Sequence, residues 1–384
     1  MFEEAVRNCA STKCDLLIIS LDYPPNDGGI SRLASGMVGA LQEAGLHIHV
    51  ITSAAEGRLG LARPASEYTE VRRCKGLRDV GILLAIRRHF QTFGSGIPIL
   101  TTVWNPEATL ALLAGSRRVI VLAHGNEVMR YRYRGLKAIF RRFVLERAKV
   151  VVCNSRFTQD LVRQIAPAAR TTVLNPSVDA DQFCSPLPSL DARKRLGLPI
   201  KKRIILTIAR LDPVKGHDTV LRAMARLNKE ELEQLHYVII GKGEMEDHLV
   251  NLAKELELES CVEFAGFQPD AALRTWFGAA NLFVLPSVLD LGRQGMEGFG
   301  MAFTEAQAAG LPVIGTRSGG IPDAIAEGEG GWLIAERDDC ALAEHFRMLI
   351  SDPSAFVEQG KLGAMRVRRD MTWQDYARRL VDLI

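Results

Sequence analysis

The sequence predicts an α/β protein with two domains, each built on a doubly wound parallel sheet. Its 384 residues exceed the size at which a single hydrophobic core usually stops growing, which favours two domains. Short apolar runs alternate with helical segments, and this alternation is typical of parallel sheets covered on both faces by helices. The pattern restarts with a buried strand at Arg203, after a proline-bearing linker over 183–188. We therefore expect domains over 1–180 and 181–365 and a terminal helical segment over 366–384.

The composition is that of an ordinary globular chain, with 47% hydrophobic and 24% charged residues. The seven cysteines are dispersed and form neither a C-x-x-C pair nor a metal-ligand spacing, which is typical of reduced thiols in the cytosol. The N-terminus lacks the apolar segment of a signal peptide, and no apolar run approaches the ~18 residues that a membrane span needs. The expectation is a cytoplasmic protein without a bound metal.

Charge is distributed unevenly between the two halves. Residues 1–177 carry 24 Lys and Arg against 14 Asp and Glu, whereas residues 178–384 carry 24 against 31. A basic first half favours an anionic partner, such as a membrane surface, a lipid diphosphate or a nucleic acid.

Two features of the first half are candidates for a ligand site. Gly28 and Gly29 lie in a loop after the first expected strand; the loop lacks the G-x-G-x-x-G fingerprint of dinucleotide sites, and a plain tight turn is the alternative. His124 stands at the carboxyl end of a strand, where open α/β sheets place ligands, although a lone histidine is more often structural. The strands expected here cover 15–20, 47–53, 97–102, 119–124 and 150–155.

The segment Met129–Lys149 mixes eight Lys and Arg residues with aromatic side chains. A basic helix that bears aromatic residues suits an anionic membrane surface, and Arg141 and Arg142 are expected among its exposed charges. The alternative is a solvated helix whose aromatic side chains belong to the core. Nucleic acid is less favoured, because no known binding motif accompanies the charge.

The second half offers a pair of cations beside a strand end. Arg210 and Lys215 follow the expected strand 203–209 and can flank one diphosphate, since Arg supplies a bidentate fork and Lys a point charge. Ordinary surface cations are the alternative. Further strands are expected at 237–241, 262–267, 282–285 and 312–316, and helices at 338–350, 353–368 and from 373 onward.

The stretch from Glu297 to Gly310 predicts an anion site. Gly298 and Gly300 allow the backbone to approach a ligand, and a short helix over about 302–309 follows, with Gly310 as its C-terminal glycine. The first turn of that helix presents unpaired N–H groups and the positive dipole end, which suits a phosphate. Glu297 and Glu305 can accept hydrogen bonds from hydroxyls on either side of the phosphate, as a nucleotide sugar requires.

The sequence Glu297-Gly-Phe-Gly-Met-Ala-Phe-Thr-Glu305 resembles the E-x7-E signature of the retaining, GT-B-fold glycosyltransferases of family 4. The downstream turn 319–322 and the R-x4-K spacing of Arg210 and Lys215 are similar to that family as well. Ala209 departs mildly from the glycine usual before the arginine. The resemblance implies a GT-B fold, in which two Rossmann-like domains face an interdomain cleft and the terminal helix returns to the first domain.

The resemblance also implies a reaction: retaining transfer of a hexose from a UDP- or GDP-sugar to a hydroxyl of a glycan, a lipid-linked or a small-molecule acceptor, without metal or other cofactor. A peripheral contact with the inner face of the cytoplasmic membrane would suit a lipid-linked acceptor. Two alternatives are a nucleotide-sugar 2-epimerase and a non-catalytic nucleotide-sugar-binding subunit.

Roles follow from the resemblance, residue by residue. The catalytic set is His124, Arg210, Lys215 and Glu297, and Glu305 would hold the ribose. The other substrate-binding positions are Gly28, Gly29, Gly243, Phe267, Phe299, Gly300, Met301, Ala302 and Phe303.

Overall fold

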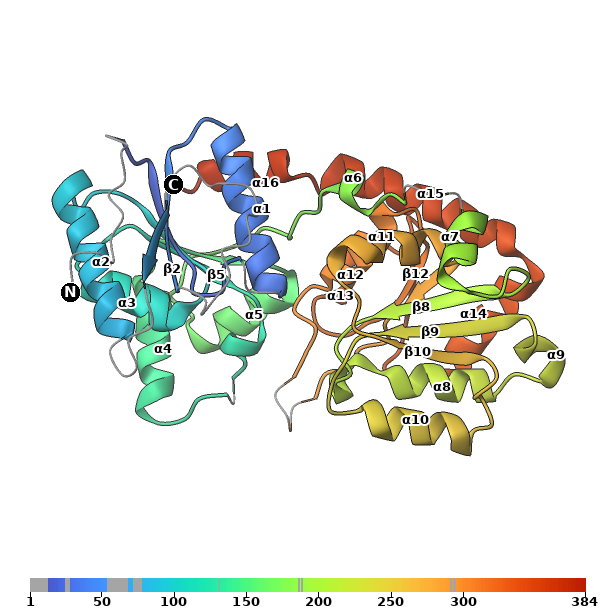
Figure 1. The fold of residues 1–384 in the computed structure, drawn as a ribbon. Coiled ribbons are helices and arrows are strands. Elements are labelled where there is room, and N and C mark those ends of the chain that lie inside the picture. The colour runs from blue at the N-terminus through green and yellow to red at the C-terminus, as the bar shows by residue number, and fades with distance from the viewer. Residues whose placement is uncertain are drawn as a thin grey trace. The chain divides into compact units, whose positions relative to one another are not determined.

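The computed structural model describes residues 13–24, 28–53, 68–71, 78–130, 132–185, 187, 189–290, 292 and 295–384. The chain forms two compact units (Figure 1). Unit 1 comprises Met1–Ser177 and Trp373–Ile384, and unit 2 comprises Val178–Thr372. The first of these limits falls three residues before the boundary expected after residue 180, and the second falls seven residues after the boundary expected after residue 365. No helix among the described residues is long and apolar enough to cross a membrane.

Unit 1 is built on a parallel sheet of seven strands in the order β3-β2-β1-β4-β5-β6-β7. Its central strands are apolar runs that are buried along their whole length, because helices cover both faces. The strands are β1 Leu16–Ile19, β2 Ile48–Ser53, β3 Tyr68–Val71, β4 Ile99–Thr101, β5 Val119–Ala123, β6 Val150–Cys153 and β7 Thr171–Val173.

Side chains alternate between the two faces of this sheet, so each strand contributes to two cores. Leu16 and Ile18 of β1 pack under α1 and α16, whereas Leu17 and Ile19 belong to the core covered by α2, α3, α4 and α5. The helices are α1 Gly29–Glu43, α2 Arg78–Phe93, α3 Thr109–Leu113, α4 Leu136–Arg147, α5 Arg156–Ile165 and α16 Trp373–Val381. Two short turns are η2 Trp104–Ala108 and η3 Asn126–Val128.

The last helix of the chain completes unit 1. α16 lies beside α1 (Figure 1), and Tyr376, Ala377 and Leu380 enter the core that α1 covers. The indole of Trp373 lies over Gly36, where a Cβ would come within 2.2 Å of the ring. Because Gly36 has no side chain, α16 can approach α1 closely at this point.

Unit 2 repeats the architecture with a parallel sheet of six strands in the order β10-β9-β8-β11-β12-β13. The prediction of two doubly wound parallel sheets is confirmed. The strands are β8 Arg203–Ile208, β9 Leu235–Ile240, β10 Val262–Gly266, β11 Leu282–Val284, β12 Val313–Thr316 and β13 Gly331–Ile334.

Helices cover both faces of the second sheet (Figure 1). α8, α10 and α14 pack on one face with β8 Ile205, and α7, α11 and α12 pack on the other with Ile204 and Leu206. The helices are α6 Ala180–Phe183, α7 Ser189–Leu196, α8 His217–Ala225, α9 Lys229–Leu232, α10 Glu246–Glu255, α11 Asp270–Ala279, α12 Met301–Ala308, α13 Ile321–Ala324, α14 Asp339–Ser351 and α15 Pro353–Asp370, with the turn η4 Pro213–Lys215.

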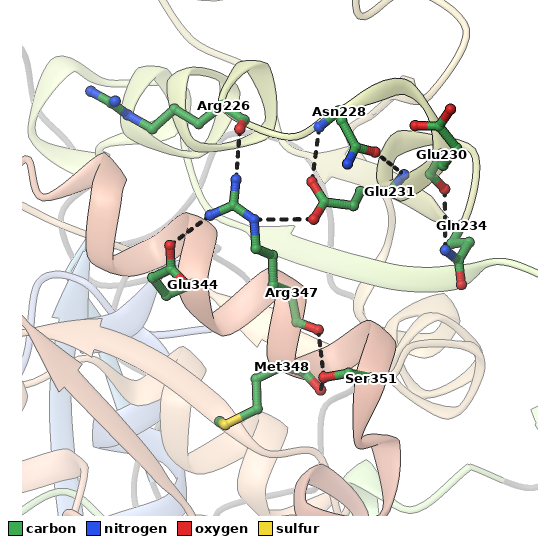
Figure 2. Close-up of polar contacts among 9 residues, drawn as sticks. All are labelled: Arg226, Asn228, Glu230, Glu231, Gln234, Glu344, Arg347, Met348 and Ser351. Atoms are coloured by element: carbon green, nitrogen blue, oxygen red, sulfur yellow. Dashed lines mark hydrogen bonds and ion pairs between the residues drawn. The ribbon is translucent and has the colours of Figure 1, made fainter.

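A polar network fastens α14 to the segment between α8 and α9 (Figure 2). The Arg347 guanidinium donates to the Glu231 and Glu344 carboxylates and to the Arg226 carbonyl oxygen, at 3.1, 2.6 and 2.8 Å. Glu231 is itself fixed, because it forms a capping box with Asn228 at the start of α9. A guanidinium that donates to three different acceptors holds these segments together better than a single exposed ion pair would.

Candidate active site

The loop after β8 carries the predicted cation pair and is shaped by close backbone contacts. The Leu211 N–H donates to the Lys242 carbonyl oxygen at 3.0 Å, which ties this loop to the one after β9. Gly216 ends η4 in the left-handed region, at φ 71°, and a Cβ there would meet the Pro286 carbonyl oxygen at 2.1 Å. A glycine is thus required where the loop turns into α8.

The two predicted cations lie in different surroundings. The Arg210 side chain is 79% exposed and pairs with Asp212 at 2.7 Å. Lys215 is only 17% exposed, and its Nζ lies 2.6 Å from Oε2 of Glu297, which is equally buried. This ion pair brings together the R-x4-K and E-x7-E loops, which are far apart in the sequence.

The turn that leads into α12 is stabilised by its neighbours on both sides. Gly300 adopts φ 97°, and a Cβ there would meet the Phe303 ring. The Glu297 carbonyl oxygen accepts a hydrogen bond from Gly320 N–H at 2.9 Å, and a Cβ on Gly319 would come within 2.4 Å of that oxygen. The Gly-Gly turn downstream therefore holds the Glu297 loop in place.

Helix α12 begins without a side-chain cap, so its first turn is available to an anion. Met301 and Ala302 open the helix and are half-buried, whereas the Phe303 N–H already donates to Gly300. Phe299 and Phe303 are buried in the core of unit 2, so only their backbone can face a ligand. Glu305 lies buried one turn further along the same helix.

The two remaining predicted positions of unit 2 follow β9 and β10. Gly243 packs against the backbone of Leu211, where a Cβ would come within 2.5 Å of the carbonyl oxygen, so contact between the loops already requires this glycine. Phe267 is exposed and is free of the core.

The predicted residues of unit 1 gather at the carboxyl edge of its sheet. His124 Nε2 lies 2.7 Å from the Thr102 carbonyl oxygen, so this nitrogen donates, and in a neutral ring Nδ1 is the acceptor. Its backbone is held by Glu127, which accepts from His124 N–H at 2.6 Å. Gly28 has φ 151° and precedes α1, and open space surrounds Gly29. Residues 25–27 of the same loop lie outside the described part of the chain.

The sequence prediction missed two acids beside this edge. Asp22 lies near Gly28, and burial raises the pKa of its carboxyl although the charge of His124 opposes the shift. Glu107 is fully buried and accepts hydrogen bonds from Leu21, Thr102 and Val103; desolvation nevertheless raises its pKa to about 7. The local sequence Trp104-Asn-Pro-Glu-Ala-Thr109 gives no signal that the carboxyl of Glu107 is buried.

A further missed residue is His217, the first residue of α8. Its Nε2 donates to the Arg210 carbonyl oxygen at 3.3 Å, and burial lowers its pKa to about 4, so the ring is neutral. His217 thus fixes the backbone of the predicted diphosphate-binding arginine.

Among the described residues, one group has the geometry to hold a metal ion: Cys14, His49 and His89, whose ligand atoms lie within 4.8 Å of one another. Cys14 precedes β1 and His49 is near the start of β2, so the group lies at the amino edge of the sheet, opposite His124. The expectation of a reaction without metal stays a prediction.

The geometry of unit 2 suits a diphosphate and its sugar. Two cations and the start of a helix can stabilise negative charge, while two carboxylates can accept hydrogen bonds from hydroxyls. These features match what a nucleotide-sugar transferase needs at its leaving group.

Comparison with known proteins finds glycosyltransferases over nearly the whole chain. A family model described as "Glycosyltransferase Family 4" matches residues 27–182, and one described as "Glycosyl transferases group 1" matches residues 189–363. A GDP-mannose-dependent alpha-(1-6)-phosphatidylinositol monomannoside mannosyltransferase of Mycolicibacterium smegmatis is 29% identical over 96% of this chain and 98% of its own length.

Solved structures show the same fold. Sucrose-phosphate synthase of Thermosynechococcus elongatus has a TM-score of 0.80 at 22% identity, covering 97% of this chain and 98% of its own. Anabaena Alr3699/HepE in complex with UDP has a TM-score of 0.77 at 17% identity, covering 96% and 98%. The two family models together span most of both units, and the chain belongs to the GT-B-fold glycosyltransferases of family 4.

Proposed function

We propose that this protein is a retaining hexosyltransferase that uses a nucleoside diphosphate sugar, with GDP-mannose as the first donor to test. The relative that is similar over nearly its whole length is named for GDP-mannose and for mannosyl transfer. UDP-sugars stay in the comparison, because the resemblance to family 4 leaves both UDP- and GDP-sugars open as donors.

The ion pair of Lys215 and Glu297 carries the proposal. Both side chains are largely buried and meet at 2.6 Å beside the uncapped start of α12. When a donor binds, its diphosphate can compete for the Lys215 ammonium, and its sugar hydroxyls can donate to the Glu297 carboxylate. Binding would thus exchange one internal ion pair for two contacts with the substrate.

The proposed chemistry is transfer on one face of the sugar. The acceptor oxygen bonds to the anomeric carbon as the bond from that carbon to the phosphate oxygen breaks, and the acceptor proton passes to the departing phosphate. Arg210, Lys215 and the helix start would stabilise the charge that develops on the leaving group. In this proposal Glu297 accepts hydrogen bonds from the sugar hydroxyls, and no residue acts as the nucleophile of a double displacement.

For the acceptor we propose a lipid-linked glycan or polyol at the inner face of the cytoplasmic membrane. The support is the name of the mannosyltransferase relative, which refers to a phosphatidylinositol monomannoside. His124, whose ring is oriented by Thr102, would contact the donor sugar from unit 1.

The alternatives are not favoured. Both family models and the mannosyltransferase relative describe transferases, which speaks against an epimerase. The cations and carboxylates of the site are all present, which speaks against a subunit that has lost catalysis.

The test is a donor panel of GDP-mannose, UDP-glucose and UDP-GlcNAc with a lipid extract as acceptor, with and without EDTA. We expect release of nucleoside diphosphate only with acceptor, no effect of EDTA, and a product with the anomeric configuration of the donor by NMR. Conversion of UDP-GlcNAc without acceptor would establish the epimerase instead. Donor binding without any turnover would favour the non-catalytic subunit.

A further inference from the structure

Helix α4 of unit 1 exposes an apolar face to solvent. Leu136, Ile139, Phe140 and Phe143 are 85, 66, 40 and 54% exposed, respectively. Their spacing of three and four residues places them in one stripe along the helix. Thirteen large hydrophobic side chains are exposed over the described ranges, and this short helix carries four of them, so the stripe is a concentration and not scatter.

The opposite face of α4 packs against the core of unit 1. Val144 and Leu145 are buried in the core of unit 1, and Arg141 is buried beside them. The Arg141 guanidinium donates to the Met129 carbonyl oxygen at 2.8 Å and lies 5.1 Å from the Tyr133 ring. The expectation that Arg141 is an exposed charge is wrong: it orders the chain before the helix. The exposed stripe is therefore not needed for packing within unit 1.

Basic side chains surround the apolar stripe. Arg132, Arg134 and Lys137 are exposed at the start of the helix, and Arg142 lies on its flank. Over residues 129–149 the only acid is Glu146, which pairs with Arg142 at 2.9 Å. An apolar stripe with a basic surround matches the interface of an anionic bilayer, where apolar side chains enter the acyl boundary and cations meet lipid headgroups.

We propose that α4 docks unit 1 on an anionic membrane by inserting Leu136, Ile139, Phe140 and Phe143 into the interface. This inference rests on the proposed lipid-linked acceptor and adds a specific surface to it. It differs from adsorption by charge alone, because insertion of apolar side chains resists salt, whereas exposed charges are screened over ~8–10 Å.

Sedimentation with vesicles separates these modes. The probes are phosphatidylcholine vesicles with and without phosphatidylglycerol, at low and high salt. We expect wild type to bind the anionic vesicles and to retain a measurable part of this binding at high salt. Ile139→Gln combined with Phe143→Gln should lower the partition coefficient at least tenfold under both conditions. The matched control, Leu190→Gln combined with Val357→Gln, removes two exposed apolar side chains from unit 2 and should bind like wild type.

Two outcomes overturn the proposal: wild type that ignores anionic vesicles at low salt, or a double α4 variant that binds them as tightly as wild type. Calorimetry with GDP and UDP on the same preparations keeps the proposed function separate. If nucleotide binding persists while vesicle binding fails, only the membrane inference falls. If neither nucleotide binds, the proposed function falls independently of the vesicle result.

Discussion

At the scale of single residues, the proposed function depends on the ion pair of Lys215 and Glu297. A buried lysine paired with a carboxylate is sensitive to loss of its partner, because the remaining charge is left without compensation. The same lysine is the predicted contact of the leaving diphosphate. A substitution at this position should therefore lower turnover, and it should also lower the stability of the fold because Glu297 loses its partner.

For Lys215→Ala we expect turnover to fall at least tenfold, which corresponds to about 1.4 kcal/mol of transition-state stabilisation. Steady-state kinetics with the best donor of the panel measures the effect. Lys361→Ala, which removes an exposed lysine paired with Glu358 at 3.4 Å, is the matched control and should leave turnover unchanged. Kinetics of Lys215→Ala that equal those of wild type would remove this residue from the mechanism.

His217 predicts a pH dependence of stability. Burial lowers its pKa to about 4 in the folded chain, against an ordinary value of 6.5, so the unfolded chain binds the proton more readily. The neutral His217 ring therefore contributes up to about 3 kcal/mol to the free energy of unfolding. This contribution is fully present above about pH 6.5 and is lost as the pH falls to about 4.

His217→Gln should flatten this part of the stability profile, since an amide can donate to the Arg210 carbonyl oxygen without titrating. Urea unfolding between pH 4 and 7 measures it, with His248→Gln as an exposed control. The pKa of His89 is lowered as well, and this residue also makes stability depend on pH. The contribution of His217 is therefore the difference between the stability profiles of the variant and of wild type. An unchanged slope in the His217 variant would contradict the assignment.

At the scale of elements, α1 and α16 show how a single missing Cβ sets the distance between two helices. Gly36 faces the Trp373 indole, whereas Gly39, one turn along α1, has open space around its Cβ position. The two glycines occupy the same helix and differ only in what they face. They therefore form a matched pair.

We expect Gly36→Ala to lower the free energy of unfolding by about 1–3 kcal/mol, because the indole must shift. Gly39→Ala should raise it by up to about 1 kcal/mol through helix propensity. Chemical denaturation of both variants, followed by the fluorescence of tryptophan, gives the comparison. Equal effects of the two substitutions would mean that α16 does not depend on this contact.

At the scale of the whole molecule, the two units differ in net charge and in the roles proposed for their residues. Residues 1–177 carry an excess of Lys and Arg and residues 178–384 an excess of acids. The residues proposed for the diphosphate and ribose, Arg210, Lys215 and Glu305, belong to unit 2. A nucleoside diphosphate, which lacks the sugar of the donor, should therefore bind to unit 2.

Hydrogen exchange tests this division. A nucleoside diphosphate should slow exchange in segments 210–216 and 297–305, because a ligand that binds the folded state suppresses local opening. The full sugar donor should add protection around His124, the proposed sugar contact of unit 1. Protection confined to unit 1 would contradict the placement of the donor site.

The sequence by itself determined the fold class, the positions of most strands, the loops that hold Arg210, Lys215 and Glu297, and the helix α12 that carries Glu305. It could do so because buried strands are continuous apolar runs, and helix ends and glycine turns are local signals. The edge strands β3 and β7 were missed because they lack this continuous apolar run. Being at the edge, they need no continuous apolar run, and β7 is only half-buried.

Only the tertiary structure decided which partners these residues meet. It paired Lys215 with Glu297, placed Gly243 against Leu211, and turned Arg141 inward to satisfy backbone carbonyls while the apolar side chains of α4 faced out. Each of these depends on contacts between segments that local patterns do not connect. A basic residue within a basic helix predicts a solvated charge, and only a specific set of carbonyl acceptors makes its burial favourable.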